Sequence, residues 1–171
     1  MTNRTNGQMR AGFTMIELIF VIVIIGILAA VAIPRLAATR DDAKISKMAN
    51  AIQTAKSELA AKIIATNNIP NDAGTEDDIK NTIKSYSNTI SEALISGDAD
   101  ITSADSNESE IEFIDKDSGT PCKVLKITGN KTTADVTLSI ESKDGASSIC
   151  QGVDSLVADT TISVAGTQVN Y

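Results

Sequence analysis

The fold is decided by one stretch of sequence, GFTMIELIFVIVIIGILAAVAIP at residues 12–34. Residues 13–33 are 21 in number, and 14 of them are Leu, Ile, Val or Phe. As an α-helix they would extend about 31 Å, which matches the hydrocarbon core of a bilayer. The apolar side chains favour insertion by about 4 to 8 kcal/mol in total. The stretch therefore predicts a membrane-spanning helix.

One carboxylate, Glu17, lies inside this apolar stretch. Its transfer into the membrane costs up to about 3 kcal/mol at the centre and less near the interface. The net free energy of insertion of the helix therefore stays favourable. Arg4 and Arg10 precede the stretch, with no acid among residues 1–12, and such a leader keeps the N-terminus in the cytoplasm. Ionisable residues inside a membrane are usually functional, so Glu17 needs an explanation.

Three interpretations of this segment compete. It could be an uncleaved anchor, or an ordinary secretory signal with its apolar region at 18–28 and an A-x-A cleavage site at 30–32. Neither explains Glu17. The third does, because residues 12–19, GFTMIELI, strongly resemble the prepilin signal of type IV pilins and type II secretion pseudopilins.

This resemblance implies cleavage between Gly12 and Phe13 and N-methylation of Phe13, so that the apolar stretch stays on the mature chain. Glu17 then becomes the fifth residue, where the family places an acid that pairs with the terminal amine of a neighbouring subunit during assembly. Pairing within one chain is the alternative, because Phe13 and Glu17 are i and i+4 on a helix. Gly26 and Pro34 fall where the family often carries a helix-loosening glycine and proline.

Beyond Pro34 the helix is expected to continue to about residue 66. Proline kinks a helix without necessarily ending it, and turn-forming residues follow at 67–72. The whole helix would span about 80 Å, too long for a compact domain of this size, so its second half needs a sheet to pack against. Apolar residues recur there at helical spacing: Ile45, Met48, Ile52, Leu59 and Ile63.

The rest of the chain predicts an α+β fold. Thr75, followed by three acids, marks the start of a second amphipathic helix, which a capping box at 89–92 could split in two. The polar, acidic residues 97–109 are interpreted as a mobile loop. Strand-like stretches follow at 111–114, 123–128, 134–141 and 160–165. We expect the long helix to pack on a roughly four-stranded antiparallel sheet, which resembles the pilin fold.

The chain is thus expected to contain five segments. They are a cleaved leader, a transmembrane and polymerisation helix, the amphipathic half of that helix, an acidic connecting region with a second helix, and a sheet with a disulfide-bounded C-terminal region. Their bounds are 1–12, 13–34, 35–66, 67–110 and 111–171.

Charge and residue content narrow the class of function. Residues 35–65 carry a net charge of +3 and residues 66–117 a net charge of −10, which suits a protein on an anionic membrane. The acidic region argues against nucleic acid as a primary partner of the globular part. The chain contains no histidine, the residue that most often serves as a general base and as a metal ligand in proteins.

The two cysteines, Cys122 and Cys150, are too few for a structural zinc site. In an exported chain they predict one disulfide, and two unrelated buried thiols are the alternative.

Two short motifs are weaker. Residues 115–119, DKDSG, are similar to a calcium loop but lack a third ligand and a closing Glu, so a plain turn is preferred and no metal or other cofactor is expected. Asn107 lies in an N-x-S acceptor with an acid two residues before it, similar to the acceptor of some bacterial N-glycosylation systems. Chance occurrence in a loop rich in Ser and Asp is the preferred interpretation.

We therefore expect a structural subunit and not an enzyme. It would sit in the bacterial inner membrane with a periplasmic C-terminal domain, be processed by prepilin peptidase, and be added by an assembly platform to a pilus-like fibre of its own copies and related pilins. The alternative is a pseudopilin of a type II secretion or DNA-uptake system. The missing histidine and the lack of a convergent catalytic set disfavour a membrane-anchored enzyme or binding module.

Overall fold

The computed structural model of the protein describes residues 12–129, 136–143 and 145–164. The chain divides into two compact units, Met1–Arg40 and Asp41–Tyr171. The first unit carries the apolar stretch, and the second contains a sheet, its covering helices and the hydrophobic core.

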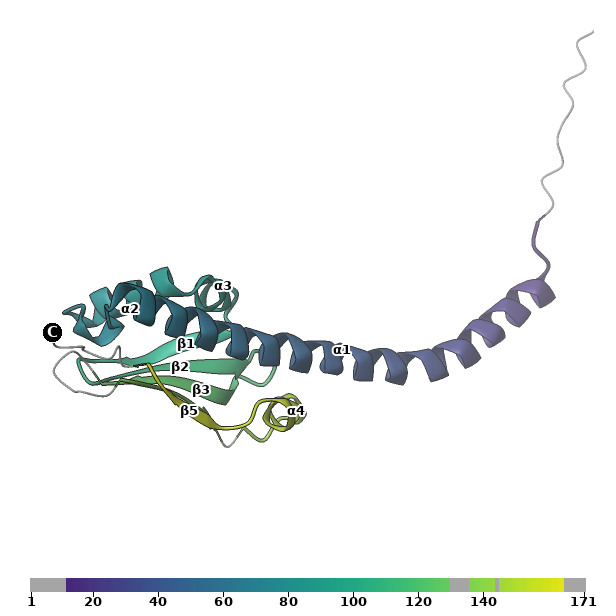
Figure 1. Cartoon of the computed structure of the whole chain (residues 1–171). Coiled ribbons are helices and arrows are strands. Elements are labelled where there is room, and N and C mark those ends of the chain that lie inside the picture. Colours follow the sequence, from purple (N-terminus) through teal and green to yellow (C-terminus); the bar gives the residue numbers. More distant parts are fainter. Residues whose placement is uncertain (1–11, 130–135, 144, 165–171) are drawn as a thin grey trace, which may run out of the picture. The chain divides into compact units, whose positions relative to one another are not determined.

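Helix α1 (Met15–Thr66) is 52 residues long and contains Pro34 (Figure 1). The prediction that the helix passes this proline and ends at about residue 66 is confirmed. The next residue, Asn67, has a φ of 47°, and a residue in this left-handed region commonly terminates a helix.

The apolar side chains of the first unit are exposed on every side of α1. The most apolar 18-residue window of the helix has a mean hydropathy of 3.1, and none of it is buried. By length and composition, α1 is the helix in the described part of the chain that can cross a membrane. A helix that is apolar all round needs lipid or other helices around it.

The second unit contains a five-stranded antiparallel sheet in which strands adjacent in sequence are adjacent in space. The α+β class and the packing of a long helix on an antiparallel sheet are confirmed. The last four strands correspond to the four predicted ones, whose residues 134, 135 and 165 lie outside the described residues. The strands are β1 (Ala99–Ala104), β2 (Glu108–Asp115), β3 (Thr120–Thr128), β4 (Thr137–Ser142) and β5 (Thr160–Ser163).

The prediction of a mobile loop at residues 97–109 is wrong, because the segment contains β1 and the beginning of β2. Ala99 pairs with Phe113 of β2, and Ala99, Ile101 and Ala104 are buried. Two of these three buried residues are alanines in a run of acids and hydroxyls, so the two-residue period carries little hydrophobic signal. Pairing with β2, whose Ile111 and Phe113 are fully buried, decides the conformation.

The predicted second helix is two helices, α2 (Glu76–Tyr86) and α3 (Asn88–Ser96). Thr75 caps α2, as predicted, and forms a reciprocal capping box. The break falls at Ser87, not at the predicted capping box of residues 89–92, because the Ser87 hydroxyl accepts a hydrogen bond from the Ile90 N–H and so begins α3.

The carboxylate of Glu58 ties α1 to this break. Its Oε2 accepts hydrogen bonds from the Ser87 hydroxyl at 2.6 Å and from the Thr89 N–H at 3.2 Å. An acid at a helix N-terminus satisfies free N–H groups and interacts favourably with the helix dipole. This contact between distant segments fixes α3 beside α1.

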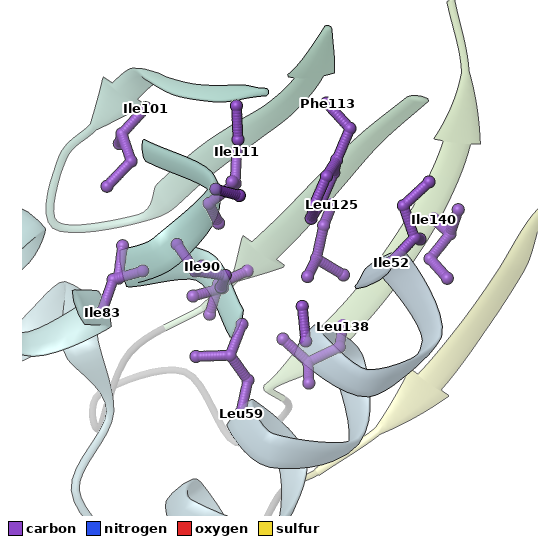
Figure 2. Close-up of a cluster of buried hydrophobic side chains, with 14 of the residues drawn as sticks. Ile52, Leu59, Ile83, Ile90, Ile101, Ile111, Phe113, Leu125, Leu138 and Ile140 are labelled. Carbon is purple, nitrogen blue, oxygen red and sulfur yellow. The ribbon is translucent and has the colours of Figure 1, made fainter. Parts of the chain in front are cut away.

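The core lies between α1 and the sheet. Ile52 and Leu59 of α1 are fully buried, and Figure 2 shows them among side chains of β3 and β4. Of the five apolar residues predicted for this face, Ile45 and Met48 are only partly buried, and the small Ala49 and Ala55 are buried instead. Buried α1 side chains are Ala49, Ile52, Ala55, Leu59 and Ile63.

A buried asparagine joins the end of α1 to the sheet. Asn71 lies in the short 3-10 helix η1 (Pro70–Asp72). Its Nδ2 donates to the carbonyls of Ile127 and Gly129, both at 3.0 Å, and its Oδ1 accepts from the Ser109 hydroxyl at 2.7 Å. All the polar atoms of the amide therefore serve as a link between η1, β2 and the end of β3.

We expect Asn71→Ala to lower the free energy of unfolding by about 2 to 3 kcal/mol, because the buried partners of the amide lose their hydrogen bonds. Urea-dependent pulse proteolysis of the full chain in mild detergent measures this change. The matched control is Asn68→Ala, an exposed asparagine three residues earlier, which should change stability by less than about 0.5 kcal/mol. Equal effects of the two substitutions would contradict the assignment.

Candidate functional site

The carboxylate of Glu17 closes a capping box at the start of α1. Its Oε2 accepts hydrogen bonds from the Thr14 N–H at 2.8 Å and from the Thr14 hydroxyl at 2.7 Å. In return the Thr14 hydroxyl accepts from the Glu17 N–H at 3.3 Å, and the Thr14 carbonyl accepts from the Leu18 N–H at 3.2 Å. Thr14 and Glu17 thus satisfy N–H groups that the first turn of a helix leaves without partners.

This contact was not predicted, although the sequence contains a pattern that indicates it. Thr14-Met15-Ile16-Glu17 is the T-x-x-E pattern of a capping box. A hydroxyl residue followed by acids was interpreted as a helix start before α2. At Glu17 the surrounding apolar stretch suggested a role in assembly instead. Glu17 therefore has a local structural function in addition to any function in assembly.

The box fixes where the carboxylate lies. Both hydrogen bonds that Glu17 accepts from Thr14 go to one oxygen, Oε2. Phe13, four residues before Glu17, is 87% exposed. In the uncleaved chain the Phe13 nitrogen belongs to a peptide bond, so an ion pair between Glu17 and a terminal amine stays a prediction.

The N-terminal part of the chain matches a known sequence family. Residues 7–33 match the family model described as the prokaryotic N-terminal methylation motif. The chain carries a prepilin-type signal. No curated protein and no solved structure matches the chain. The match covers the leader and the apolar part of α1 and ends before the second unit begins.

Most of the predicted processing residues lie inside the prepilin signal. Gly12, Phe13, Glu17 and Gly26 fall within the matched residues, and Pro34 follows directly after them. A side chain at Gly26 would meet no other atom within 4 Å, so packing within the chain does not require glycine there. Cleavage, methylation and a kink at Gly26 or Pro34 stay predictions.

The predicted disulfide between Cys122 and Cys150 is confirmed, with a Cα–Cα distance of 4.6 Å. It joins β3 to α4 (Ser148–Leu156), a helix that the sequence analysis did not predict. A bridge that closes a loop of this length contributes about 3 to 4 kcal/mol in the chain-entropy model. The Ser147 hydroxyl, which accepts from the Cys150 N–H, caps the same helix.

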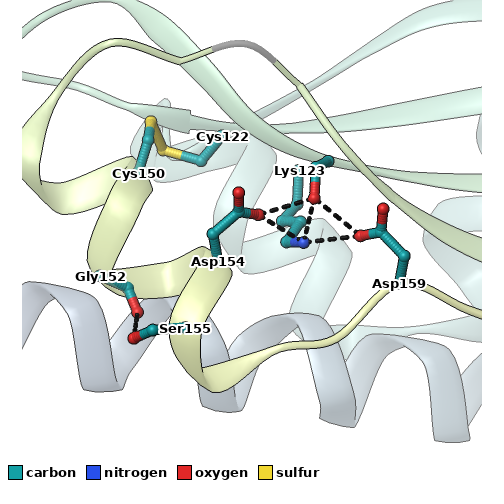
Figure 3. Close-up of polar contacts among 8 residues, drawn as sticks. Cys122, Lys123, Cys150, Gly152, Asp154, Ser155 and Asp159 are labelled. Carbon is teal, nitrogen blue, oxygen red and sulfur yellow. Dashed lines mark hydrogen bonds and ion pairs between the residues drawn. A yellow bond between two sulfur atoms is a disulfide. The ribbon is translucent and has the colours of Figure 1, made fainter.

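Beside the disulfide, Figure 3 shows the buried Lys123 with two partly exposed aspartates, Asp154 and Asp159. Together with Ser142 they form an ion cluster that we call the Lys123 clasp. The Lys123 side chain is only 1% exposed, and its Nζ lies 2.5 Å from Asp154 Oδ1 and 2.7 Å from Asp159 Oδ1. Nζ also donates to the Ser142 hydroxyl at 2.6 Å. The clasp therefore links β3 to β4, to α4 and to the segment that leads into β5.

Burial by itself lowers the pKa of Lys123, but the hydrogen bonds to Asp154 and Asp159 outweigh it and raise the pKa above its ordinary value. The hydrogen bond from Lys123 lowers the pKa of both aspartates. The two effects have the same cause, because each partner stabilises the charged form of the other. Around neutral pH the clasp is a set of ion pairs.

The calcium-like residues 115–119 form a turn. Asp115 Oδ1 accepts from the Asp117 N–H at 3.2 Å, and Oδ2 accepts from the Ser118 hydroxyl at 2.7 Å. Gly119 has a φ of 69°, and its N–H donates to the Asp115 carbonyl. Within the described residues no group of three potential metal ligands is brought together. The side chain of Asp115 thus has a structural role in the turn.

The N-x-S acceptor lies at the turn between β1 and β2. Asn107 is exposed, but Ser109, the hydroxyl residue of the acceptor, is fully buried and donates to Asn71. Asp105 Oδ1 accepts from the N–H groups of Asn107 and Glu108, both at 2.8 Å. A transferase that needs the Ser109 hydroxyl would have to act before the sheet forms. Modification of Asn107 stays a prediction.

Proposed function

We propose that this protein is a structural subunit of a fibre of the type IV pilus or pseudopilus kind. The observation that carries the proposal is the prepilin-type signal at residues 7–33, joined to a long helix whose apolar half is exposed on every side. A chain that stayed a monomer would use that half as an anchor alone. A chain that polymerises exchanges lipid for neighbouring helices around the same surface.

In this proposal prepilin peptidase cleaves after Gly12 and the new N-terminus is Phe13, which carries a cationic amine. The Thr14–Glu17 box holds the carboxylate at the first turn of the helix. In a medium of low dielectric an amine of a neighbouring subunit is attracted strongly to this carboxylate, and an unpaired charge there is costly. The pair would set the axial position of each incoming subunit.

A contact between two different surfaces of identical subunits builds an open helix if the rotation does not close. The contact between one subunit's amine and another's carboxylate is of this kind. The second unit, with its acidic α2 and β2, would form the outside of the fibre, and the role requires neither a cofactor nor a catalytic residue. Before assembly the first unit would lie in the inner membrane with its N-terminus in the cytoplasm.

Intact-mass and N-terminal analysis of membrane-extracted protein tests the proposal. We expect a chain that begins at N-methylated Phe13 and retains the Cys122–Cys150 disulfide. A chain that begins at Ile33 would indicate an ordinary signal peptide, and one that keeps residues 1–12 would indicate a plain anchor. Either of these two results would overturn the proposed function. A Gly12→Leu variant, which should block cleavage, is the matched control for the processing step.

A further inference from the structure

The second unit has a groove between α1 and the end of the sheet, with a volume of about 390 Å³. Met48, Ala93, Phe113 and Ile149 contribute to its apolar lining. A water molecule takes about 30 Å³ of liquid, so the groove is large enough for a branched side chain and several waters. An apolar hollow of this size at a surface is typical of a site that another group fills.

Most of the charges around the groove are already paired. Lys44 forms an ion pair with Asp117, and Lys47 Nζ lies 2.7 Å from Asp98 Oδ2. Lys116 donates to the Ser96 carbonyl at 2.8 Å.

The exposed Glu92 of α3 also borders the groove, and in the described part of the chain it has no ion pair. The groove therefore offers an apolar floor with one carboxylate available at its edge.

We infer that this groove receives Leu36 of a second copy of the chain, with Arg40 of that copy paired to Glu92. The inference rests on the proposed function, because it assigns a contact in the fibre. Leu36 and Arg40 are i and i+4 on α1, so they lie on one face of the helix. A helix cannot bend back to insert its own Leu36, so the occupant comes from another copy.

Charge complementarity selects Leu36 among the large apolar side chains exposed beyond the membrane segment. Those found in the described residues are Leu36, Ile64, Ile95 and Leu156. Leu36 is 67% exposed and has the cation Arg40 one turn away.

The other three exposed side chains fit less well. Acids lie near Ile95 and Leu156 in the sequence, and they would be repelled by Glu92, whereas no residue three or four positions from Ile64 is charged. Ile95 also belongs to α3, which forms a wall of the groove, so its insertion would pair α3 with α3 and close a dimer. A contact between Leu36 and the groove joins two different surfaces and can propagate along a fibre.

Site-directed crosslinking tests the contact in assembled fibres. Leu36→Cys and Glu92→Cys are combined in one chain and treated with a short bifunctional maleimide, to which the disulfide-bonded Cys122 and Cys150 do not respond. We expect a ladder of covalent multimers from the double variant and none from either single variant. The matched control is Leu36→Cys with Lys84→Cys, an exposed position on α2 that does not border the groove.

Charge reversal tests the same contact without cysteines. We expect Arg40→Glu and Glu92→Arg each to cause loss of most surface fibres, and the combined variant to recover them, because it restores an opposite-charge pair. Absence of recovery would overturn the pairing.

Two kinds of failure are distinguishable. Fibres that form normally but give no Leu36–Glu92 ladder, or give an equal ladder with the Lys84 control, would overturn the groove contact and leave the proposed function intact. A lipid that copurifies in the groove would overturn it as well. A wild-type chain that is processed at Ile33 and forms no fibre would overturn the proposed function and this inference together.

Discussion

Replacing Glu17 with valine should leave the protein in the inner membrane and abolish its assembly into fibres. Removal of the acid makes insertion easier, because a carboxylate in the apolar stretch costs up to about 3 kcal/mol. Assembly loses the one charge in the apolar part of α1 that can pair with a neighbouring subunit's amine. Membrane fractionation measures the first effect, and the yield of sheared surface fibres measures the second.

The capping box gives this experiment its control. Thr14→Val keeps a β-branched side chain but removes the hydroxyl that bonds Glu17. Loss of a capping interaction costs about 1 kcal/mol, so fibres should be reduced and not abolished. If Glu17 acted only as a helix cap, Thr14→Val and Glu17→Val would reduce the fibre yield equally. Normal fibre yield from Glu17→Val would remove the assembly role altogether.

The isosteric substitution Glu17→Gln separates charge from shape. Glutamine can still accept a hydrogen bond from the Thr14 hydroxyl and complete a capping box. It cannot neutralise an amine. We therefore expect Glu17→Gln to behave like Glu17→Val in assembly and like the wild type in the stability of the first helical turn, which amide hydrogen exchange in detergent reports.

Removing both carboxylates of the Lys123 clasp should cause a large loss of stability in the second unit. In Asp154→Asn combined with Asp159→Asn, the Lys123 side chain, which is 1% exposed, keeps its charge but has no counter-charge. Removal of one side of a buried ion pair costs about 3 to 5 kcal/mol. Asparagine can still accept hydrogen bonds, so we expect the lower end, about 3 kcal/mol, in urea-dependent pulse proteolysis.

Lys123→Met should be much milder than the double aspartate variant. Asp154 and Asp159 are 45% and 54% exposed, so both can be hydrated when the ammonium is gone, and methionine fills a similar volume with apolar atoms. Exchange of a buried charge for a well-packed apolar group is often neutral, so the cost should be about 1 kcal/mol or less. Equal losses in the two variants would contradict this account of the clasp.

Comparison of the wild type with Lys123→Met at different pH values tests the ion pairing. The pKa of Asp154 and of Asp159 is lowered from the ordinary value of 3.8, first of all by the hydrogen bond from Lys123. Their contribution is therefore complete above that value and is lost as the pH falls through the lower folded-state pKa. Stability of the wild type relative to Lys123→Met should be constant from pH 7 to about 5 and should decrease below about 4. A difference that is independent of pH would contradict the ion pairing.

The position of the clasp explains why a large effect is expected from two half-exposed aspartates. The disulfide at Cys122 and Cys150 holds one end of α4 to β3, and Asp154 holds the other end to the adjacent residue of the same strand (Figure 3). Gly152, between them, approaches the side chain of Ile45 so closely that an added Cβ would lie 2.3 Å from Ile45 Cδ1. α4 is thus fixed to both β3 and α1.

Much of the fold could be read from local patterns. The apolar run, the T-x-x-[DE] start of α2 and the helical spacing from Met48 to Ile63 each lie within a few residues of one another, so short-range physics decides them. The pairing of Cys122 with Cys150 followed from their number and the export signal. β1 could not be predicted in this way, because its sequence is weakly apolar and its conformation depends on pairing with β2. α4 was missed although local signals were present, since Ser147 is an N-cap residue and the buried Ile149 and Val153 are four residues apart.

At the candidate site, too, some properties of Glu17 could be predicted from the sequence and others could not. That Glu17 is an acid in an apolar helix was visible in the sequence, and so was the prepilin signal around it. The structure added that the carboxylate is already engaged by Thr14, and that T-x-x-E is a helix start as well as part of a signal. The proposed ion pair between Glu17 and the amine of a neighbouring subunit involves a second chain, so it depends on more than the fold of one subunit.

Hydropathy, period and residue count act over short distances along the chain, so they were enough to predict the prepilin-type signal, the long helix, the α+β class and the disulfide partners. Which polar residues are buried depends instead on contacts between distant segments. Lys123 meets Asp154 and Asp159, and Asn71 meets Ser109, across separations of more than 30 residues. No local pattern marks such residues, because they are stable inside the protein only when the fold brings their partners to them.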